Sequence, residues 1–277
     1  MRARFGAHAC LSLIAVLAGF QSASAADNLP QNWQIDMPEA VTPVMEGMRD
    51  FHTLLMVIIT AITLFVLGLL LWVMYRYRES ANPVPSKVSH NTIVEVLWTI
   101  VPVLILVVIA IPSFRLLYQQ YSFPKADVTI KVTGKQWYWS YEYPDYKNVA
   151  FDAYPVDEKD LKPGQVPLLA TDNEIVVPVN KVVHALVTSG DVTHQWIVLG
   201  FGTRADAIPG RVNRTWFQAT KIGTYYGQCS QLCGQGHPYM PINVKVVSEA
   251  DFNKWIQAKQ QTAALEGSRT ASASLTK

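Results

Sequence analysis

Two long uncharged segments restrict the fold of this chain more than any other feature. Residues 54–75 contain no charged side chain over 22 positions, and residues 96–114 contain none over 19. Each segment is long enough to cross a hydrocarbon core of about 30 Å as an α-helix. The sequence therefore predicts a transmembrane helical hairpin, which we place at residues 49–120.

Basic residues in the intervening loop indicate how this hairpin is oriented. The loop carries Arg76, Arg78 and Lys87 against one acid, Glu79. By the positive-inside rule it lies on the cytoplasmic side of the membrane, so both ends of the hairpin face outward. The N-terminal segment at residues 26–48 and everything after the hairpin are then expected outside the cytoplasm.

The first 25 residues have the pattern of a secretory signal peptide. Two arginines precede an apolar run at residues 11–20, and Ala-Ser-Ala ends at Ala25. The apolar run is too short to span a membrane as a helix. Cleavage after Ala25 would remove Cys10 and leave Cys229 and Cys233 as the remaining cysteines, so no other disulfide could form within the chain.

Short β-rich runs separated by turn residues begin after Phe123. We predict strands at residues 128–133, 136–143, 174–179, 182–188, 195–199, 215–219 and 243–247. Seven or more short strands in roughly 125 residues favour an all-β Greek-key sandwich, which we place at residues 121–258. Residues 145–165 are expected to form a long loop, and residues 259–277 a disordered tail.

The stretch Y-G-Q-C-S-Q-L-C-G-Q-G-H-P-Y-M at residues 226–240 carries the chemistry. It places Cys229, Cys233, His237 and Met240 at intervals of four, four and three residues. Thiolate, imidazole and thioether together suit copper, because soft sulfur holds Cu(I) and nitrogen accommodates Cu(II). We therefore expect a copper site that accepts and releases one electron.

Two cysteines are one thiolate too many for a mononuclear blue-copper site. Two thiolates can instead bridge two metal ions, and the second ion then needs a second imidazole. His194 is the candidate, because loops cluster at one end of a sandwich. Two alternatives remain open: the cysteines could form a structural disulfide, and His194 could be an ordinary loop or core histidine.

Two further residues allow more than one interpretation. Glu95 stands at the cytoplasmic entrance to the second apolar segment, where it could lie in the headgroup layer or serve a proton path. Trp137 belongs to an aromatic run, residues 134–144, whose rings by default fill the sandwich core. If the Trp137 indole lies on the opposite face, it is a contact anchor for a protein partner.

Four motifs now define a resemblance. They are G-K-Q-W-Y-W-S-Y-E-Y at residues 134–143, D-V-T-H-Q-W at 191–196, D-A-I-P-G-R at 206–211 and Y-G-Q-C-S-Q-L-C-G-Q-G-H-P-Y-M-P-I at 226–242. In this order, after a signal peptide and a hairpin, they resemble subunit II of bacterial, aa3-like haem-copper cytochrome c oxidases. The resemblance covers residues from about 45 to 247.

The resemblance implies a hairpin followed by a cupredoxin-like β-sandwich that carries a dinuclear copper centre, CuA. Cys229 and Cys233 would bridge two copper ions, and one imidazole would bind each ion. The remaining ligands would be Met240 and the backbone carbonyl of Gln231. The implied full metal set is His194, Cys229, Gln231, Cys233, His237 and Met240.

The resemblance also implies partners. Electrons would enter from cytochrome c at Trp137, and Glu95 would mark the mouth of a proton pathway into the haem-copper catalytic subunit I. Asp206 would lie near the interface with that subunit. The expected docking residues for cytochrome c are Gln136, Trp137, Asp172 and Asp191. The chain would sit among other oxidase subunits and membrane lipid in the bacterial plasma membrane, with both termini and the copper domain in the periplasm.

One departure from the family pattern concerns a second metal. The family usually has Glu between the two cysteines, where its side chain also binds a magnesium ion shared with the catalytic subunit, but this chain has Gln231. A neutral amide is a poorer ligand for a hard cation than a carboxylate. The interfacial magnesium is therefore in doubt.

The charge of the chain bears on two kinds of partner, nucleic acid and a basic cytochrome. A formal net charge of +2 over 277 residues does not indicate nucleic acid binding. Residues 124–247 contain 12 basic and 11 acidic side chains, so the β-rich part is not acidic overall. Docking of a basic cytochrome would then depend less on charge and more on apolar contact around Trp137.

Other functions fit the sequence less well. A copper chaperone would show a βαβ pattern and one anchor helix, and a quinol oxidase subunit would lack the copper ligands. Nitrous oxide reductase is a much longer soluble chain. A subunit with its own c-type haem would carry C-x-x-C-H, which this chain does not have. A purely structural membrane protein has no need of this ligand spacing.

Overall fold

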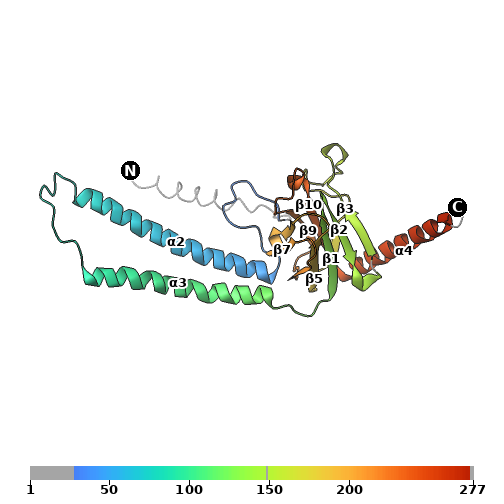
Figure 1. The fold of residues 1–277 in the computed structure, drawn as a ribbon, viewed down its shortest axis with the longest axis horizontal. Helices are drawn as coiled ribbons and strands as arrows, with labels where there is room; N and C mark the ends of the chain where they lie inside the picture. Colours follow the sequence, from blue (N-terminus) through green and yellow to red (C-terminus); the bar gives the residue numbers. More distant parts are fainter. Residues whose placement is uncertain (1–27, 148, 275–277) are drawn as a thin grey trace, which may run out of the picture.

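The computed structural model describes residues 28–147 and 149–274, and within them two long helices lead into a β-sandwich that a further helix follows (Figure 1). The expected signal peptide, residues 1–25, lies outside the described residues. Both long helices extend to the same side of the sandwich, side by side (Figure 1).

The two long helices are α2 (Pro43–Arg76) and α3 (Thr92–Tyr121), and both are long and apolar enough to cross a membrane. They exceed the uncharged segments because their caps lie further out. Thr42 caps α2 by accepting a hydrogen bond from the Met45 N–H at 3.1 Å, ahead of a proline at the first helical position. The side chain of Asn91 caps α3.

The sandwich consists of two five-stranded sheets. The first has the order β3 (Val149–Ala153), β2 (Tyr138–Tyr143), β1 (Val128–Lys135), β5 (Val183–Ser189) and β8 (Asn213–Phe217). The second has the order β4 (Ile175–Pro178), β10 (Pro241–Val247), β9 (Gly223–Gln228), β6 (His194–Val198) and β7 (Thr203–Ala207). Strands β1 and β5 are parallel, as are β4 and β10, and the other pairs are antiparallel.

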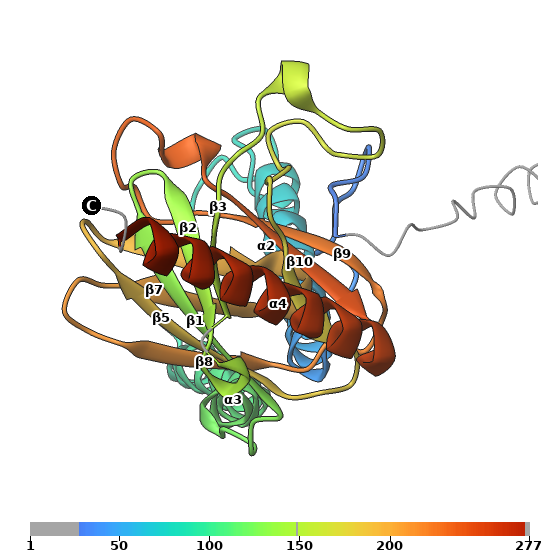
Figure 2. The ribbon, with the colours of Figure 1, turned by 90° about the vertical axis from the view of Figure 1, so that its right-hand side faces the viewer.

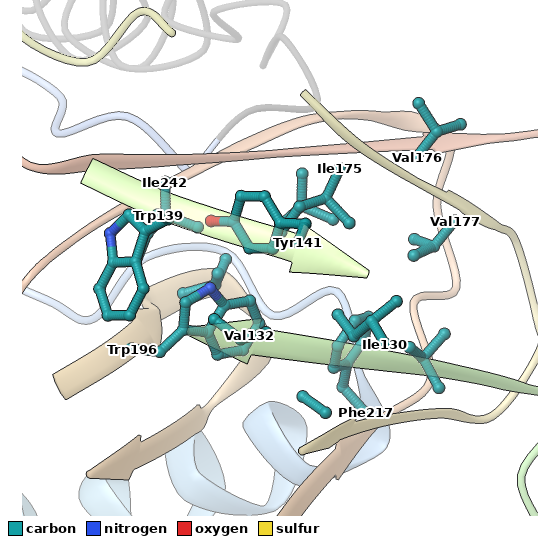
Figure 3. Packing of buried hydrophobic residues seen from close by; sticks show 14 of the residues in the cluster. Ile130, Val132, Trp139, Tyr141, Ile175, Val176, Val177, Trp196, Phe217 and Ile242 are labelled. Carbon is teal, nitrogen blue, oxygen red and sulfur yellow. The ribbon is translucent and has the colours of Figure 1, made fainter. Parts of the chain in front are cut away.

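Large aromatic side chains fill the space between the sheets. Alternate residues of β2 point inward, so that Trp139, Tyr141 and Tyr143 are buried. Trp196 and Phe217 approach Trp139 and Tyr141 from other strands (Figure 3). Strand β1 alternates in the same way. The expected core role of the aromatic run is therefore confirmed for these rings, and Trp137 lies in the turn before β2.

The structure corrects two expectations about secondary structure. Strands β3, β7 and β9 were not predicted, and β3 lies inside the expected loop 145–165. The expected disordered tail at 259–277 is wrong as far as the structure describes it, because α4 (Glu249–Ser274) continues through most of it. Four short 3₁₀ turns complete the described elements: η1 (Pro144–Tyr146), η2 (Glu158–Asp160), η3 (Leu199–Phe201) and η4 (His237–Tyr239).

Helix α4 forms because its first turns have a sandwich surface to pack on. Phe252 and Ile256, four residues apart, are both buried, and α4 contacts β3 and β4. The helix lies across one face of the sandwich (Figure 2). Ser248 stabilises the start of the helix by accepting a hydrogen bond from the Asp251 N–H at 3.1 Å. Trp255 lies edge-on to Tyr143 at 5.3 Å between ring centroids.

Hydrogen bonds join the sandwich to the start of α2 and to the end of α3. The Trp216 indole N–H donates to the Gln120 carbonyl in the last turn of α3 at 3.1 Å. The Thr42 hydroxyl, at the start of α2, donates to the Phe201 carbonyl at 2.7 Å. The two helices are thus attached to the domain at separate points.

Candidate metal centre

His194 begins strand β6 and is fully buried. Its Nε2 atom lies 2.8 Å from Oδ1 of Asp191, which fixes the ring orientation. Gly134 makes room for the ring, because a Cβ at that position would lie 2.8 Å from Cδ2 of His194. The other ring nitrogen, Nδ1, is 3.9 Å from the Sγ atom of Cys229.

Cys229 and Cys233 are buried free thiols in the loop between β9 and β10, with their Sγ atoms 3.8 Å apart. The start of the loop is held in place because the Cys229 N–H donates to the Met240 carbonyl at 2.9 Å. The ligand atoms of His194, Cys229 and Cys233 all lie within 4.8 Å of one another. The structure therefore contains two thiols rather than the alternative disulfide.

The remaining predicted ligands surround the thiols. The Nδ1 atom of His237, at the start of η4, lies 3.6 Å from the Sγ atom of Cys233. The backbone oxygen of Gln231 lies 3.3 Å from the Sγ atom of Cys229. Met240 is fully buried immediately before β10. Each thiol thus has an imidazole of its own.

The surroundings of the two thiols separate their acidities. Burial disfavours a thiolate at Cys229, but contacts with His194 and with the backbone at Gln195 and Gln231 outweigh burial and lower the pKa of Cys229 to about 6. Burial, together with the neighbouring Cys229, raises the pKa of Cys233. Without a metal, the pair therefore holds one thiolate near neutral pH.

His194 and Asp191 perturb each other in the same manner. Burial lowers the pKa of His194, but contacts with Cys229 and Asp191 raise it by more. Burial raises the pKa of Asp191, but His194 and the N–H groups of Gln136 and Val192 hold it below its usual value. The carboxylate of Asp191 is thus kept ionised beside the imidazole.

Trp137 packs against the cysteine loop on the outer side of the site. Its indole N–H donates to the Cys233 carbonyl at 3.2 Å, and the side-chain amide of Gln136 donates to the same oxygen at 2.9 Å. A Cβ at Gly236 would lie 2.5 Å from Cγ of Trp137, so the ring rests directly on the loop backbone. Trp137 is half-buried, which leaves part of the indole accessible.

The donor set limits which ions this cluster fits. The ligand atoms of the buried residues His194, Cys229 and Cys233 lie within 4.8 Å of one another, and the half-buried His237 lies beside Cys233. Soft sulfur with imidazole suits copper better than a hard cation such as magnesium. The residues present therefore fit copper binding.

Comparison with known protein families covers both parts of the chain. Residues 128–247 match the family described as cytochrome c oxidase subunit II, periplasmic domain, and residues 30–116 match cytochrome c oxidase subunit II, transmembrane domain. The chain belongs to the cytochrome c oxidase subunit II family. Its fold is accordingly two apolar helices followed by a cupredoxin-like sandwich, and it is a membrane protein.

Two relatives agree with this assignment in sequence. The chain is 50% identical over 234 residues to a probable cytochrome c oxidase subunit 2 of Rickettsia prowazekii, an alignment that covers 84% of this chain and 75% of the relative. It is 47% identical over 253 residues to the corresponding protein of Rickettsia felis, covering 91% and 80%. The crystal structure of the periplasmic domain of subunit II of cytochrome oxidase from Bradyrhizobium japonicum is 50% identical, with a TM-score of 0.48 and coverage of 51% and 99%.

Two predicted residues of this subunit II chain lie away from the thiols. Glu95 is in the first turn of α3, where its Oε1 atom accepts a hydrogen bond from the Asn91 N–H at 3.3 Å. That contact is the back-bonding half of a helix cap. Asp172 accepts from the Tyr154 N–H at 2.7 Å, and the Tyr154 ring stacks on Tyr138, next to Trp137 in the chain.

Asp206 lies at the β6–β7 pair, where it accepts a hydrogen bond from the Gln195 side chain. It lines a polar cavity of about 580 Å³ together with Arg204, Arg211 and Arg214.

Sequence reasoning missed one role at this subunit II site. Asp191 was predicted as a docking residue, but in the structure its carboxylate contacts the buried His194. The D-x-x-H spacing was the available signal, because a histidine ligand commonly donates its second N–H to a carboxylate. The glycines that admit the His194 and Trp137 rings had no comparable signal, since the contact is between segments distant in sequence.

Proposed function

We propose that this chain is the electron-entry subunit of a cytochrome c oxidase, receiving electrons from cytochrome c and passing them to a haem-copper catalytic subunit that reduces oxygen to water and translocates protons. The observation that carries the proposal is the pair of free thiols 3.8 Å apart, each with an imidazole Nδ1 within 3.9 Å. This symmetry favours two metal ions over one.

The proposed ligands are the six residues that the resemblance to the family implies. Cys229 and Cys233 would hold two copper ions between them, His194 and His237 would each bind one, and Met240 and the Gln231 carbonyl would complete the set. Bound in this way, the dinuclear centre, CuA, would supply one-electron exchange. The protein's own contribution is a prearranged donor set, in which Asp191 fixes the orientation of His194.

Trp137 is the proposed entry point for electrons. Its indole N–H reaches the backbone carbonyl of Cys233, so a single hydrogen bond connects a partly accessible ring to a proposed ligand. Gln136 supports the same carbonyl. Leu232 and Tyr239, 75% and 55% exposed on the ligand loop, supply apolar surface for a docked cytochrome.

The two acids proposed for cytochrome docking, Asp172 and Asp191, differ in how accessible their carboxylates are. Asp172 is exposed, and its contact with Tyr154 leaves carboxylate surface open to a basic partner. Asp191 contributes to docking only through charge, because its oxygens already accept hydrogen bonds from Gln136, Val192 and His194. The two acids together would orient a basic cytochrome.

The remaining parts of the proposal concern the membrane. We place the copper domain and both termini in the periplasm of a bacterium, with the α2–α3 loop in the cytoplasm, on the basis of the basic loop residues. Glu95 then stands at the cytoplasmic end of α3, beside a shallow cavity lined by Thr99 and Ile100, as the proposed entrance to a proton pathway in the catalytic subunit. Gln231 argues against a shared magnesium ion.

Copper analysis and electron paramagnetic resonance on the purified chain test the proposal. Two copper ions per chain sharing one unpaired electron are the expected result. One copper ion per chain would reduce the site to a mononuclear centre and reject the proposed relay. A chain that binds no copper and oxidises to a Cys229–Cys233 disulfide would reject the metal site altogether.

A further inference from the structure

The segment that precedes α2 contacts strand β9, which leads into the loop that carries Cys229 and Cys233. The side-chain amide of Asn28 donates to the Tyr226 carbonyl, and its oxygen accepts from the Tyr226 N–H, both at 2.7 Å. The two residues are 198 positions apart. Asn28 is only 6% exposed, and Tyr226 lies in β9, three residues before Cys229.

Strand β9 leaves room for this contact because one of its neighbours, β6, pairs with it only briefly. It pairs with β10 along its length, but with β6 at a single register position, Val198 to Gly227. In an antiparallel ladder, alternate residues direct both backbone groups away from a given neighbour. The side-chain amide of Asn28 offers one donor and one acceptor to Tyr226, as a paired strand would.

The fit around Asn28 is close. A Cβ at Gly200 would lie 2.9 Å from Cβ of Asn28, and a Cβ at Gly227 would lie 1.9 Å from the Ile197 carbonyl oxygen. Strands β6 and β9 therefore touch at Gly227, and Asn28 occupies the adjacent position. A cavity of about 470 Å³ is lined by both Asn28 and Cys229.

We propose that Asn28 is a positioning residue for the loop between β9 and β10. Its amide hydrogen-bonds to the backbone of Tyr226 near the end of β9 and so holds Cys229, at the start of the loop, in place. The inference rests on the proposed function only in naming Cys229 as a ligand. The contact belongs to the protein itself and acts before any metal binds.

The test compares variants of the full chain in detergent, free of metal and reduced. For Asn28→Ala we expect amide exchange in residues 223–229 and alkylation of Cys229 to become about tenfold faster, as loss of two buried hydrogen bonds implies. Copper added to this variant should give an altered visible spectrum. Glu39→Gln is the matched control, because it removes an ion pair with Lys221 from the same segment and leaves Asn28 intact.

A size-matched variant separates hydrogen bonding from packing. Asn28→Asp keeps the acceptor for the Tyr226 N–H but cannot donate to the Tyr226 carbonyl, so Cys229 should again react faster than in the unchanged chain. Alkylation at the unchanged rate in both Asn28 variants, or equal acceleration in Glu39→Gln, would overturn the inference. A chain that binds no copper would defeat the proposed function while leaving these metal-free rates interpretable.

Discussion

At the scale of single residues, the site depends on groups that touch the proposed ligands without being ligands. Asp191 accepts from His194, and Gln136 and Trp137 donate to the Cys233 carbonyl. Such contacts set the orientation of a ligand before a metal arrives. Their removal should therefore weaken metal binding while the fold persists.

Asp191→Asn tests this expectation directly. The neutral amide is a weaker acceptor for the His194 N–H, so copper affinity should fall by about 10–100-fold. Competition with a copper chelator measures the change. Asp172→Asn is the matched control, because Asp172 contacts the Tyr154 backbone and not His194; equal losses in both variants would refute the positioning role of Asp191.

The acidity of Cys229 gives a second prediction. Its pKa is lowered to about 6, so its thiolate should be present above that pH and lost as the pH falls below it. Alkylation of the metal-free chain, followed by fragment sequencing, should show one cysteine reacting with a midpoint near pH 6. Reaction of both thiols with the ordinary midpoint of about 8.5 would contradict the prediction.

At the scale of secondary structure, the sequence predicted elements where periodicity and composition were strong. The two long helices follow from the uncharged segments. The start of α2 at the Thr42-Pro43 cap was not predicted. Strand β7 (T-R-A-D-A) is short and polar, and β9 (G-T-Y-Y-G-Q) contains two glycines, so neither has a clear strand pattern. Tertiary pairing, which sequence alone does not display, makes them strands.

The residues of the candidate site also differ in how well the sequence predicts them. Ligand spacing within residues 226–240 predicted four ligands, and His194 was found because the loop needed another imidazole. Asn28 and Gly134 could not be found, because their importance arises from contacts with segments far along the chain. Proposed metal ligands are recognisable by their spacing in the sequence, whereas the residues that pack around them are not.

Helix α4 provides a prediction about stability. Phe252→Ala should cost about 3–5 kcal/mol, because it leaves a cavity where the ring is 2% exposed against the sandwich. Thermal unfolding in detergent, followed by tryptophan fluorescence, should shift downward by about 10 °C. Asn253→Ala, on the exposed side of the same turn, should leave the midpoint nearly unchanged. A similar midpoint for both variants would mean that α4 does not stabilise the domain.

At the scale of the whole molecule, charge and apolar surface predict how a cytochrome would dock. The domain is nearly balanced in charge, and exposed Leu232 and Tyr239 share the ligand loop on which Trp137 rests. The rate of cytochrome c oxidation by the assembled oxidase should therefore change less than about tenfold between roughly 0.01 and 0.15 M ionic strength. A fall of several decades, typical of strong steering, would show that charge dominates.

The double attachment of the sandwich to its helices has a consequence for the whole enzyme. Trp216 is tied to the end of α3, and Phe201 to the cap of α2. Two separated ties resist rocking in a way that a single hinge would not. The depth of the helices in the bilayer therefore sets the height of the thiol pair above the membrane surface. A tilt of one helix would also reorient the surface to which an electron donor binds.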